Sequence, residues 1–140
     1  MLFMVGIERP HEDNNAWGIV VPAFEKLGYV CVSAADEKEE ILYRAKAAIL
    51  TLAEEVIEDG HRLATLNEEW TDYSDEYPEF SEWLALEVPV EGLTGRQKRI
   101  NITMSEPMLA RVDTFVSFHH EFKDRSDFLA QAAEKLMQTD

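Results

Sequence analysis

The chain has 140 residues, and 13 Lys and Arg against 28 Asp and Glu give it a formal net charge of −15. This length accommodates one ordinary domain or two small ones. Because 46% of the residues are hydrophobic and 10% are aromatic, the chain can bury a core, which argues against a disordered acidic tail. We therefore expect a folded, soluble protein.

A single cysteine excludes an intramolecular disulfide framework and a cysteine-rich zinc site. No apolar run approaches the roughly 18 residues that span a bilayer. Residues 1–7 lack the basic region and the small-residue cleavage site of a secretory signal, and Glu8 follows at once. We expect a cytoplasmic protein.

The charge is unevenly distributed along the chain. Residues 1–95 contain 6 basic and 21 acidic residues, whereas residues 96–140 contain 7 of each. Phosphate binding depends on Lys and Arg, so the negative charge argues against a nucleic-acid partner for the first part only. The two parts are expected to have different partners.

Three apolar stretches with β-branched residues open the chain and predict strands. The segment 13–15, Asp-Asn-Asn, supplies turn chemistry between the first two, which favours an antiparallel meander. The three stretches are Leu2–Ile7, Ala16–Val21 and Gly28–Ser33.

An amphipathic helix is predicted after these strands. Asp36 and Glu39 have the spacing of a capping box. Apolar residues then recur about every 3.6 residues until Gly60, a residue typical of the position that follows a helix. Such a helix can cover one face of a small sheet.

Residues 61–81 are acidic, with aromatic residues interleaved among the carboxylates. A strand, Trp83–Val90, is predicted next, and the glycine-containing segment 91–95 is typical of a hinge. Such an acidic segment is most often a solvated loop whose aromatic side chains pack on the sheet. The functional alternative is a surface that presents carboxylates and aromatic anchors to a cationic partner.

The remaining segment predicts a strand and two helices. Arg99–Met104 alternates strictly, so a strand places Ile100, Ile102 and Met104 on one face and Arg99, Asn101 and Thr103 on the other. Ser105 is predicted to cap the first helix, with Pro107 in its first turn, and Ser126 to cap the second. The apolar stripes of the two helices are Met108, Leu109, Val112, Phe115 and Val116, and Phe128, Leu129, Ala132, Ala133, Leu136 and Met137.

A lone strand has no partner for its backbone, and two short helices cannot bury all this apolar surface. A homodimer satisfies both needs, because two copies of the strand can pair as an antiparallel ribbon under four helices. The other face of the ribbon then displays Arg99, Asn101 and Thr103, residue types that read base edges in the major groove.

The segment 99–137, RINITMSEPMLARVDTF…RSDFLAQAAEKL, resembles a ribbon-helix-helix DNA-binding domain. The resemblance implies that Arg99, Asn101 and Thr103 read bases and that the second helix holds a phosphate at Ser126. Arg125 and Lys98 add positive charge for phosphate attraction.

The whole chain resembles the HicB antitoxin family. The matching N-terminal residues are the strand Trp17–Pro22 and the helix Asp36–Gly60. The resemblance implies an α+β protein: a small antiparallel sheet with one long helix, of degraded ribonuclease H-like fold, followed by a ribbon-helix-helix domain. The implied boundaries are 1–91 for a toxin-neutralising domain, 92–96 for a hinge and 97–140 for DNA binding and dimerisation.

The resemblance also implies the partners. The acidic N-terminal domain would bind and inhibit a small basic mRNA-cleaving toxin, similar to HicA, and the C-terminal dimer would repress the shared operon by binding operator DNA. The oligomer would be a dimer or a tetramer. The toxin-binding candidates are Trp70, Tyr73, Asp75, Glu76 and Tyr77.

No catalytic residue, metal ligand or cofactor is predicted. Cys31 lies within a predicted strand, which favours a small core residue over a nucleophile, and no acidic quartet suits two metals. Two alternatives stay open. One is a ribbon-helix-helix repressor whose N-terminal domain senses a small ligand, and the other is a nuclease relic with metal-dependent activity.

Overall fold

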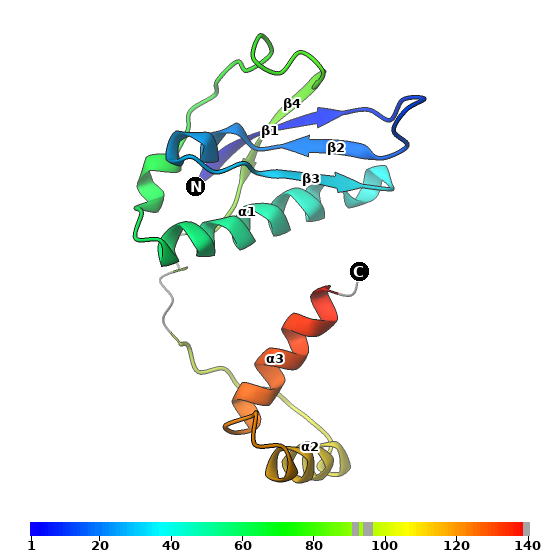
Figure 1. Cartoon of the computed structure of the whole chain (residues 1–140), viewed down its shortest axis with the longest axis vertical. Helices are drawn as coiled ribbons and strands as arrows, with labels where there is room; N and C mark the ends of the chain where they lie inside the picture. Colours follow the sequence, from blue (N-terminus) through cyan, green and yellow to red (C-terminus); the bar gives the residue numbers. More distant parts are fainter. Residues whose placement is uncertain (91–92, 94–96, 139–140) are drawn as a thin grey trace. The chain divides into compact units, whose positions relative to one another are not determined.

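The computed structural model describes residues 1–90, 93 and 97–138. The chain divides into two compact units, Met1–Gln97 and Lys98–Asp140, of which the first holds a sheet and the longest helix and the second holds two helices (Figure 1). Apart from Leu93, the predicted hinge at 92–96 lies outside the described residues. No helix in the described part of the chain is long and apolar enough to cross a membrane.

The first unit contains a four-stranded antiparallel sheet with the strand order β3-β2-β1-β4. The predicted meander of the first three strands is confirmed, and the fourth strand pairs with the free side of the first. The strands are β1 (Leu2–Glu8), β2 (Trp17–Val20), β3 (Val32–Ala35) and β4 (Glu82–Glu87).

The third strand begins later than predicted. Pro22–Leu27 forms a 3-10 turn, η1, which ends at Gly28 with a φ of 83°, a conformation that costs glycine little. The chain then rejoins β2 where the N–H of Val21 donates to the carbonyl of Cys31 at 2.9 Å. The predicted start at Gly28 was wrong because this glycine terminates the preceding turn.

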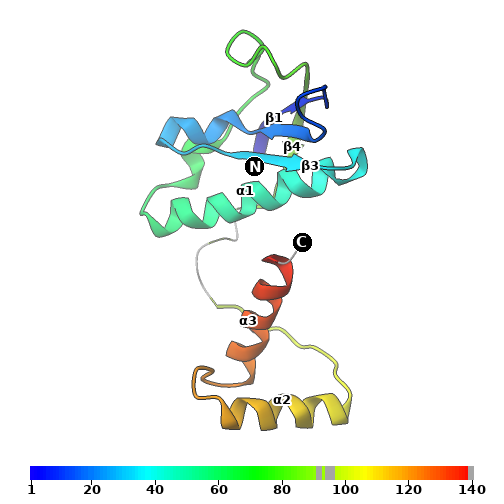
Figure 2. The same ribbon diagram turned by 45° about the vertical axis from the view of Figure 1, so that its right-hand side comes forward.

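Helix α1 (Ile41–Glu58) covers one face of the sheet, as predicted (Figures 1 and 2). The capping box predicted from Asp36 is wrong. A 3-10 turn, η2 (Lys38–Glu40), precedes the helix, and the N-cap residue Glu40 makes no side-chain capping bond. The predicted helix end is confirmed, because Gly60 follows the helix with a φ of 88°.

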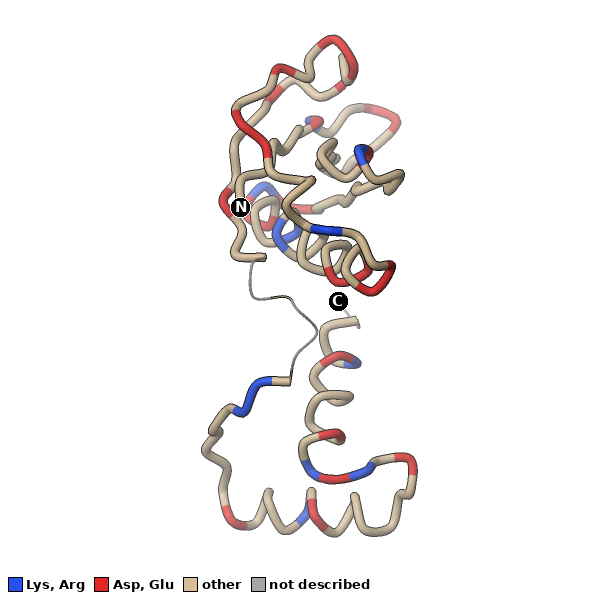
Figure 3. The backbone as a smooth tube through the Cα atoms, turned by 90° about the vertical axis from the view of Figure 1, so that its left-hand side faces the viewer, with Lys and Arg blue, Asp and Glu red and all other residues tan. Residues whose placement is uncertain are grey.

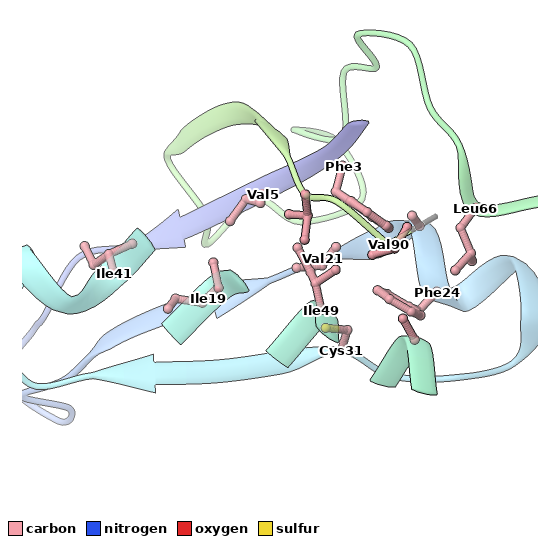
Figure 4. Packing of buried hydrophobic residues seen from close by; sticks show 14 of the residues in the cluster. Phe3, Val5, Ile19, Val21, Phe24, Cys31, Ile41, Ile49, Leu66 and Val90 are labelled. Carbon is pink, nitrogen blue, oxygen red and sulfur yellow. The ribbon is translucent and has the colours of Figure 1, made fainter. Parts of the chain in front are cut away.

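The main core lies between the sheet and α1 (Figure 4). Alternate residues of β1 point into it, and small residues on α1 let the helix approach the sheet closely. The core side chains from these two elements are Phe3, Val5, Ile7, Ile41, Ala45, Ile49, Ala53 and Val56.

The opposite face of β1 is also buried. Met4 is fully buried on that face, and a Cβ atom added to Gly6 would lie 2.7 Å from the ring of Trp83. The covering segment runs from the 3-10 turn η3 (Leu63–Leu66) to β4 and passes on the side of the sheet away from α1 (Figures 1 and 2). We call residues 67–81 the acidic loop.

The second unit contains helices α2 (Glu106–Phe118) and α3 (Arg125–Gln138). The predicted cap of α2 is confirmed, because Oγ of Ser105 accepts a hydrogen bond from the N–H of Met108 at 3.3 Å. A proline in the first turn of α2 also follows the prediction.

The predicted cap of α3 is wrong, because α3 begins one residue before Ser126. Oδ1 of Asp124 accepts from the N–H of Asp127 at 2.8 Å, and Oδ2 of Asp127 accepts from the N–H of Lys123 at 2.9 Å. Asp124 therefore takes the capping role expected of Ser126, and the carboxylate of Asp127 reaches back to the chain that precedes the helix.

Gly6→Ala tests the close contact between β1 and the acidic-loop side of the sheet. The added methyl group must displace the Trp83 ring, so we expect the free energy of unfolding to fall by about 1–3 kcal/mol in urea titrations. Gly18→Ala is the matched control, because its Cβ would meet the nearest atom, Cβ of Glu8, at 3.2 Å. Equal losses in the two variants would contradict this packing.

Candidate functional site

Two of the aromatic residues predicted as toxin contacts, Tyr73 and Tyr77, form a cluster with Trp83 and Phe80. The rings of Tyr73 and Tyr77 lie 5.6 and 6.0 Å from that of Trp83, and Phe80 lies 6.4 Å away. Nε1 of Trp83 donates to the carbonyl of Phe80 at 2.9 Å. These aromatic side chains therefore pack on the sheet, which is the structural alternative that the sequence left open for them.

Two tyrosine–carboxylate hydrogen bonds hold the acidic loop in place. The hydroxyl of Tyr73 donates to Oε2 of Glu68, and that of Tyr77 donates to Oε1 of Glu25. Desolvation, followed by these hydrogen bonds, raises the pKa of both phenols. An unperturbed phenol, with a pKa of about 10, is already protonated at neutral pH, so both tyrosines act as donors.

Glu68 has a structural role that the sequence did not indicate. Its side chain is 1% exposed, and its Oε1 accepts from the backbone N–H of Met4 at 3.2 Å while Nζ of Lys26 lies 3.8 Å from its Oε2. Buried carboxylates need such partners. The local sequence Leu66-Asn67-Glu68 gives no signal of this burial, because a glutamate is ordinarily exposed.

The remaining loop candidates point to solvent. Trp70 is 67% exposed, and Asp75 and Glu76 are exposed. Carboxylates recur along the acidic loop (Figure 3). Of the five predicted toxin contacts, these three are free of the packing that holds Tyr73 and Tyr77, so the loop can present an aromatic anchor beside negative charge.

The predicted base-reading segment is exposed and makes no strand pairing among the residues that the structure describes. Arg99, Asn101 and Thr103 are exposed, and Ile100 and Ile102 on the other alternate positions are 74% and 59% exposed. A single chain therefore leaves the apolar positions of the predicted strand in water.

The two helices of the second unit bury little of their apolar surface. Phe115 contacts Phe128 with ring centroids 5.3 Å apart, yet it remains 42% exposed, and Phe118 is 77% exposed. An open groove of about 470 Å³ on α2 is lined by Ala110, Arg111, Thr114, Phe115, Phe118 and His119. Exposed apolar surface of this kind marks an interaction site.

The predicted phosphate contacts near α3 are surrounded by aspartates. Nε and Nη2 of Arg125 donate to the carboxylate of Asp113 at 2.9 and 2.8 Å, and this hydrogen bonding lowers the pKa of Asp113. Ser126 lies in the first turn between Asp124 and Asp127, and hydrogen bonds from the N–H of Lys123 and from Gln131 lower the pKa of Asp127. Lys98, the third predicted phosphate contact, is exposed.

Cys31 behaves as the small core residue that the sequence predicts. It is 4% exposed and free of disulfide bonding, and burial raises the pKa of its thiol to about 12, so it is not an activated nucleophile. Among the described residues, no group of three His, Cys, Asp or Glu side chains is arranged to hold a metal ion.

These features define a mixed α/β protein with a small four-stranded antiparallel sheet, an acidic aromatic surface on one unit and exposed apolar helices on the other. Residues 3–133 match the family model of the HicB-like antitoxin of bacterial toxin–antitoxin systems. The chain therefore belongs to the HicB-like antitoxin family, and the family implies a toxin as its partner.

A relative and a solved structure show further similarity. The chain is 34% identical over 137 residues to an "uncharacterized 14.9 kDa protein in rep-hol intergenic region" of Haemophilus phage HP1, strain HP1c1, with 95% of each chain covered. It is also similar to the crystal structure of the Burkholderia pseudomallei antitoxin HicB, with 22% identity, a TM-score of 0.49, and 99% of this chain and 98% of the other covered.

Tyr73→Phe tests whether the acidic loop depends on buried Glu68. Loss of the hydroxyl leaves a buried carboxylate oxygen short of a donor, so we expect the free energy of unfolding to fall by about 1–3 kcal/mol in urea titrations. Tyr77→Phe is the control, because its partner Glu25 is exposed and water can replace the lost bond. A loss in Tyr77→Phe as large as in Tyr73→Phe would contradict the role of Glu68.

Proposed function

We propose that this antitoxin binds and inhibits a small basic mRNA-cleaving toxin, similar to HicA, and represses its own operon by binding operator DNA as a ribbon-helix-helix dimer. Residues 1–91, with a degraded ribonuclease H-like fold, neutralise the toxin. Residues 92–96 act as the hinge, and residues 97–140 dimerise and bind DNA. Both targets place the protein in the cytoplasm, and the antitoxin itself is not an enzyme.

The observation that carries the DNA-binding half is the exposed apolar surface of the second unit. Ile100 and Ile102 alternate on one side of an unpaired segment, and Phe118 on α2 is 77% exposed. Pairing of two copies of this segment would satisfy its backbone groups, and the four helices would cover Ile100 and Ile102. This requirement for a second copy supports the dimer.

In such a ribbon, the side chains on the face away from Ile100 and Ile102 enter the major groove. Arg99 matches guanine O6 and N7, Asn101 matches adenine, and Thr103 contacts a base edge or a thymine methyl group. Lys98 supplies phosphate attraction at the start of the segment. Arg125 reaches phosphate only by exchanging its bond to Asp113, and Ser126 offers its N–H beside two aspartates, so these two contacts contribute less than the strand.

The charge distribution supports toxin binding by the first unit and DNA binding by the second. Residues 1–95 carry 21 acidic and 6 basic residues, whereas residues 96–140 carry 7 of each. An acidic surface attracts a basic protein and repels phosphate. The proposed toxin surface consists of the exposed residues Trp70, Asp75 and Glu76. Tyr73 and Tyr77 hold the loop that carries them.

Arg99→Ala and Asn101→Ala test base reading. Each variant should lose about 1–3 kcal/mol of operator binding, because one base-edge contact disappears while the apolar face is unchanged. The measurement is a gel-shift titration at fixed salt with the DNA upstream of the gene. Ile102→Lys is the control for dimerisation and should abolish both the dimer, seen by analytical ultracentrifugation, and DNA binding. Wild-type affinity in Arg99→Ala and Asn101→Ala would reject the ribbon.

Trp70→Ala tests the toxin surface. Burial of an exposed tryptophan at an interface contributes about 2 kcal/mol or more, so we expect the dissociation constant for the toxin encoded by the adjacent reading frame to rise at least about tenfold. Isothermal titration calorimetry gives the constant, and Trp70→Phe, which keeps an aromatic ring at the same position, is the matched control. If both variants bind the toxin as the wild type does, the loop is not the toxin surface.

A further inference from the structure

Strand β3 forms one edge of the sheet and leaves backbone groups unpaired. The N–H of Val21 donates to the carbonyl of Cys31, and in this register Ile19 pairs with Ser33. Hydrogen-bonded and non-hydrogen-bonded pairs alternate in an antiparallel ladder. The N–H and C=O groups of Val32 and Ala34 therefore point away from β2, toward the free edge.

Although β3 has only four residues, its edge carries neither the charged side chains nor the prolines that protect an edge strand. Residues 30–35 contain no charged side chain, and Val30 and Val32 are 70% and 61% exposed. The other edge strand, β4, begins with Glu82 and ends with Glu87, and charge on an edge discourages pairing with another chain. The β3 edge is thus the side of the sheet that is open to strand addition.

An open groove of about 320 Å³ runs beside this edge, between β3 and α1. Its lining includes Val30 and Val32 from the strand side and Ala47, Ala48 and Leu52 from the helix. Arg44 also lines the groove, and its buried Nε has no hydrogen-bond partner among the described residues. An incoming segment can therefore fill a largely apolar groove with its side chains.

The charges around the groove identify the kind of partner. The segment 36–40 at one end of β3 contains four carboxylates and one lysine, and the segment 54–59, at the far end of α1, contains four carboxylates and no basic residue. Arg44 is already paired with Glu40, at 3.4 Å, and Lys46 is the other basic residue of α1. A strand flanked by basic residues is complementary to such a groove.

We propose that an extended segment of a basic protein adds to β3 as a fifth strand and places apolar side chains in the groove beside α1. The inference rests on the proposed function, because the basic protein is the toxin. A second copy of this chain fits less well, since two acidic first units would approach each other.

The test uses the full-length ¹⁵N-labelled chain with the protein encoded by the adjacent reading frame, and it measures amide hydrogen exchange by NMR. Strand addition should slow exchange of the Val32 and Ala34 amides by at least about tenfold on binding. The amides of Ser33 and Ala35 serve as internal controls, because they already face β2 and should be protected in the free chain.

Edge variants supply a second readout, the dissociation constant for the same protein. Val32→Pro removes an outward N–H without removing a bond to β2, and we expect about tenfold weaker binding. Ala34→Lys should weaken binding more than Ala34→Glu does, because lysine repels a basic strand. Unchanged melting temperatures show that the variants remain folded.

The outcomes separate this inference from the proposed function. Binding by the wild type with unchanged Val32 and Ala34 exchange, and wild-type affinity in the edge variants, overturns strand addition and leaves toxin binding standing. Protection of these amides that grows with concentration of the chain alone assigns the edge to a second copy and also overturns the inference. If the wild type does not bind the adjacent-frame protein, the proposed function fails and the inference fails with it.

Discussion

Burial of β1 on both faces is the constraint on which the first unit depends. Successive side chains of a strand point to opposite faces, so each face of β1 must fit a different packing partner. Phe3 and Val5 pack on the α1 side, whereas Met4 and Gly6 lie on the other side. Gly6 makes room for Trp83, and the aromatic cluster around that ring lets a polar, acidic loop cover an apolar sheet. The acidic surface is thus attached to the core by aromatic packing and by buried Glu68.

This arrangement explains how a unit with many carboxylates remains folded. Most of the carboxylates lie in exposed segments, where water screens their repulsion. Glu68 is the buried polar residue in the described part of the chain, and its oxygens receive a backbone N–H and a phenol. The negative potential of these carboxylates attracts a basic partner, and the proposed function uses this property.

The second unit presents the opposite situation. Its 6 basic and 7 acidic residues nearly balance, yet α2 and α3 leave Phe118 and Met137 largely exposed, so its packing is incomplete in one chain. Capping by Asp124 and Asp127 and the bond between Arg125 and Asp113 stabilise the two helices locally. They also place carboxylates where the resemblance implies a phosphate, which gives the proposed ribbon a larger share of DNA recognition than the start of α3.

Hydrophobic periodicity is a local property, so the four strands of the first unit, the helix that ends before Gly60 and the cap of α2 by Ser105 could all be predicted from the sequence. The predicted strand Arg99–Met104 does not form in one chain, because the described residues of that chain provide no pairing partner for it. The uneven charge distribution and the resemblance to the antitoxin family could also be recognised from the sequence. The starts of α1 and α3 could not be predicted, since Glu40 and Asp124 are the N-cap residues in place of the expected Asp36 and Ser126. The support of the loop by Tyr73 and Tyr77, the burial of Glu68 and the edge position of β3 could not be predicted from the sequence. They depend on contacts between residues far apart along the chain, such as Met4 and Glu68.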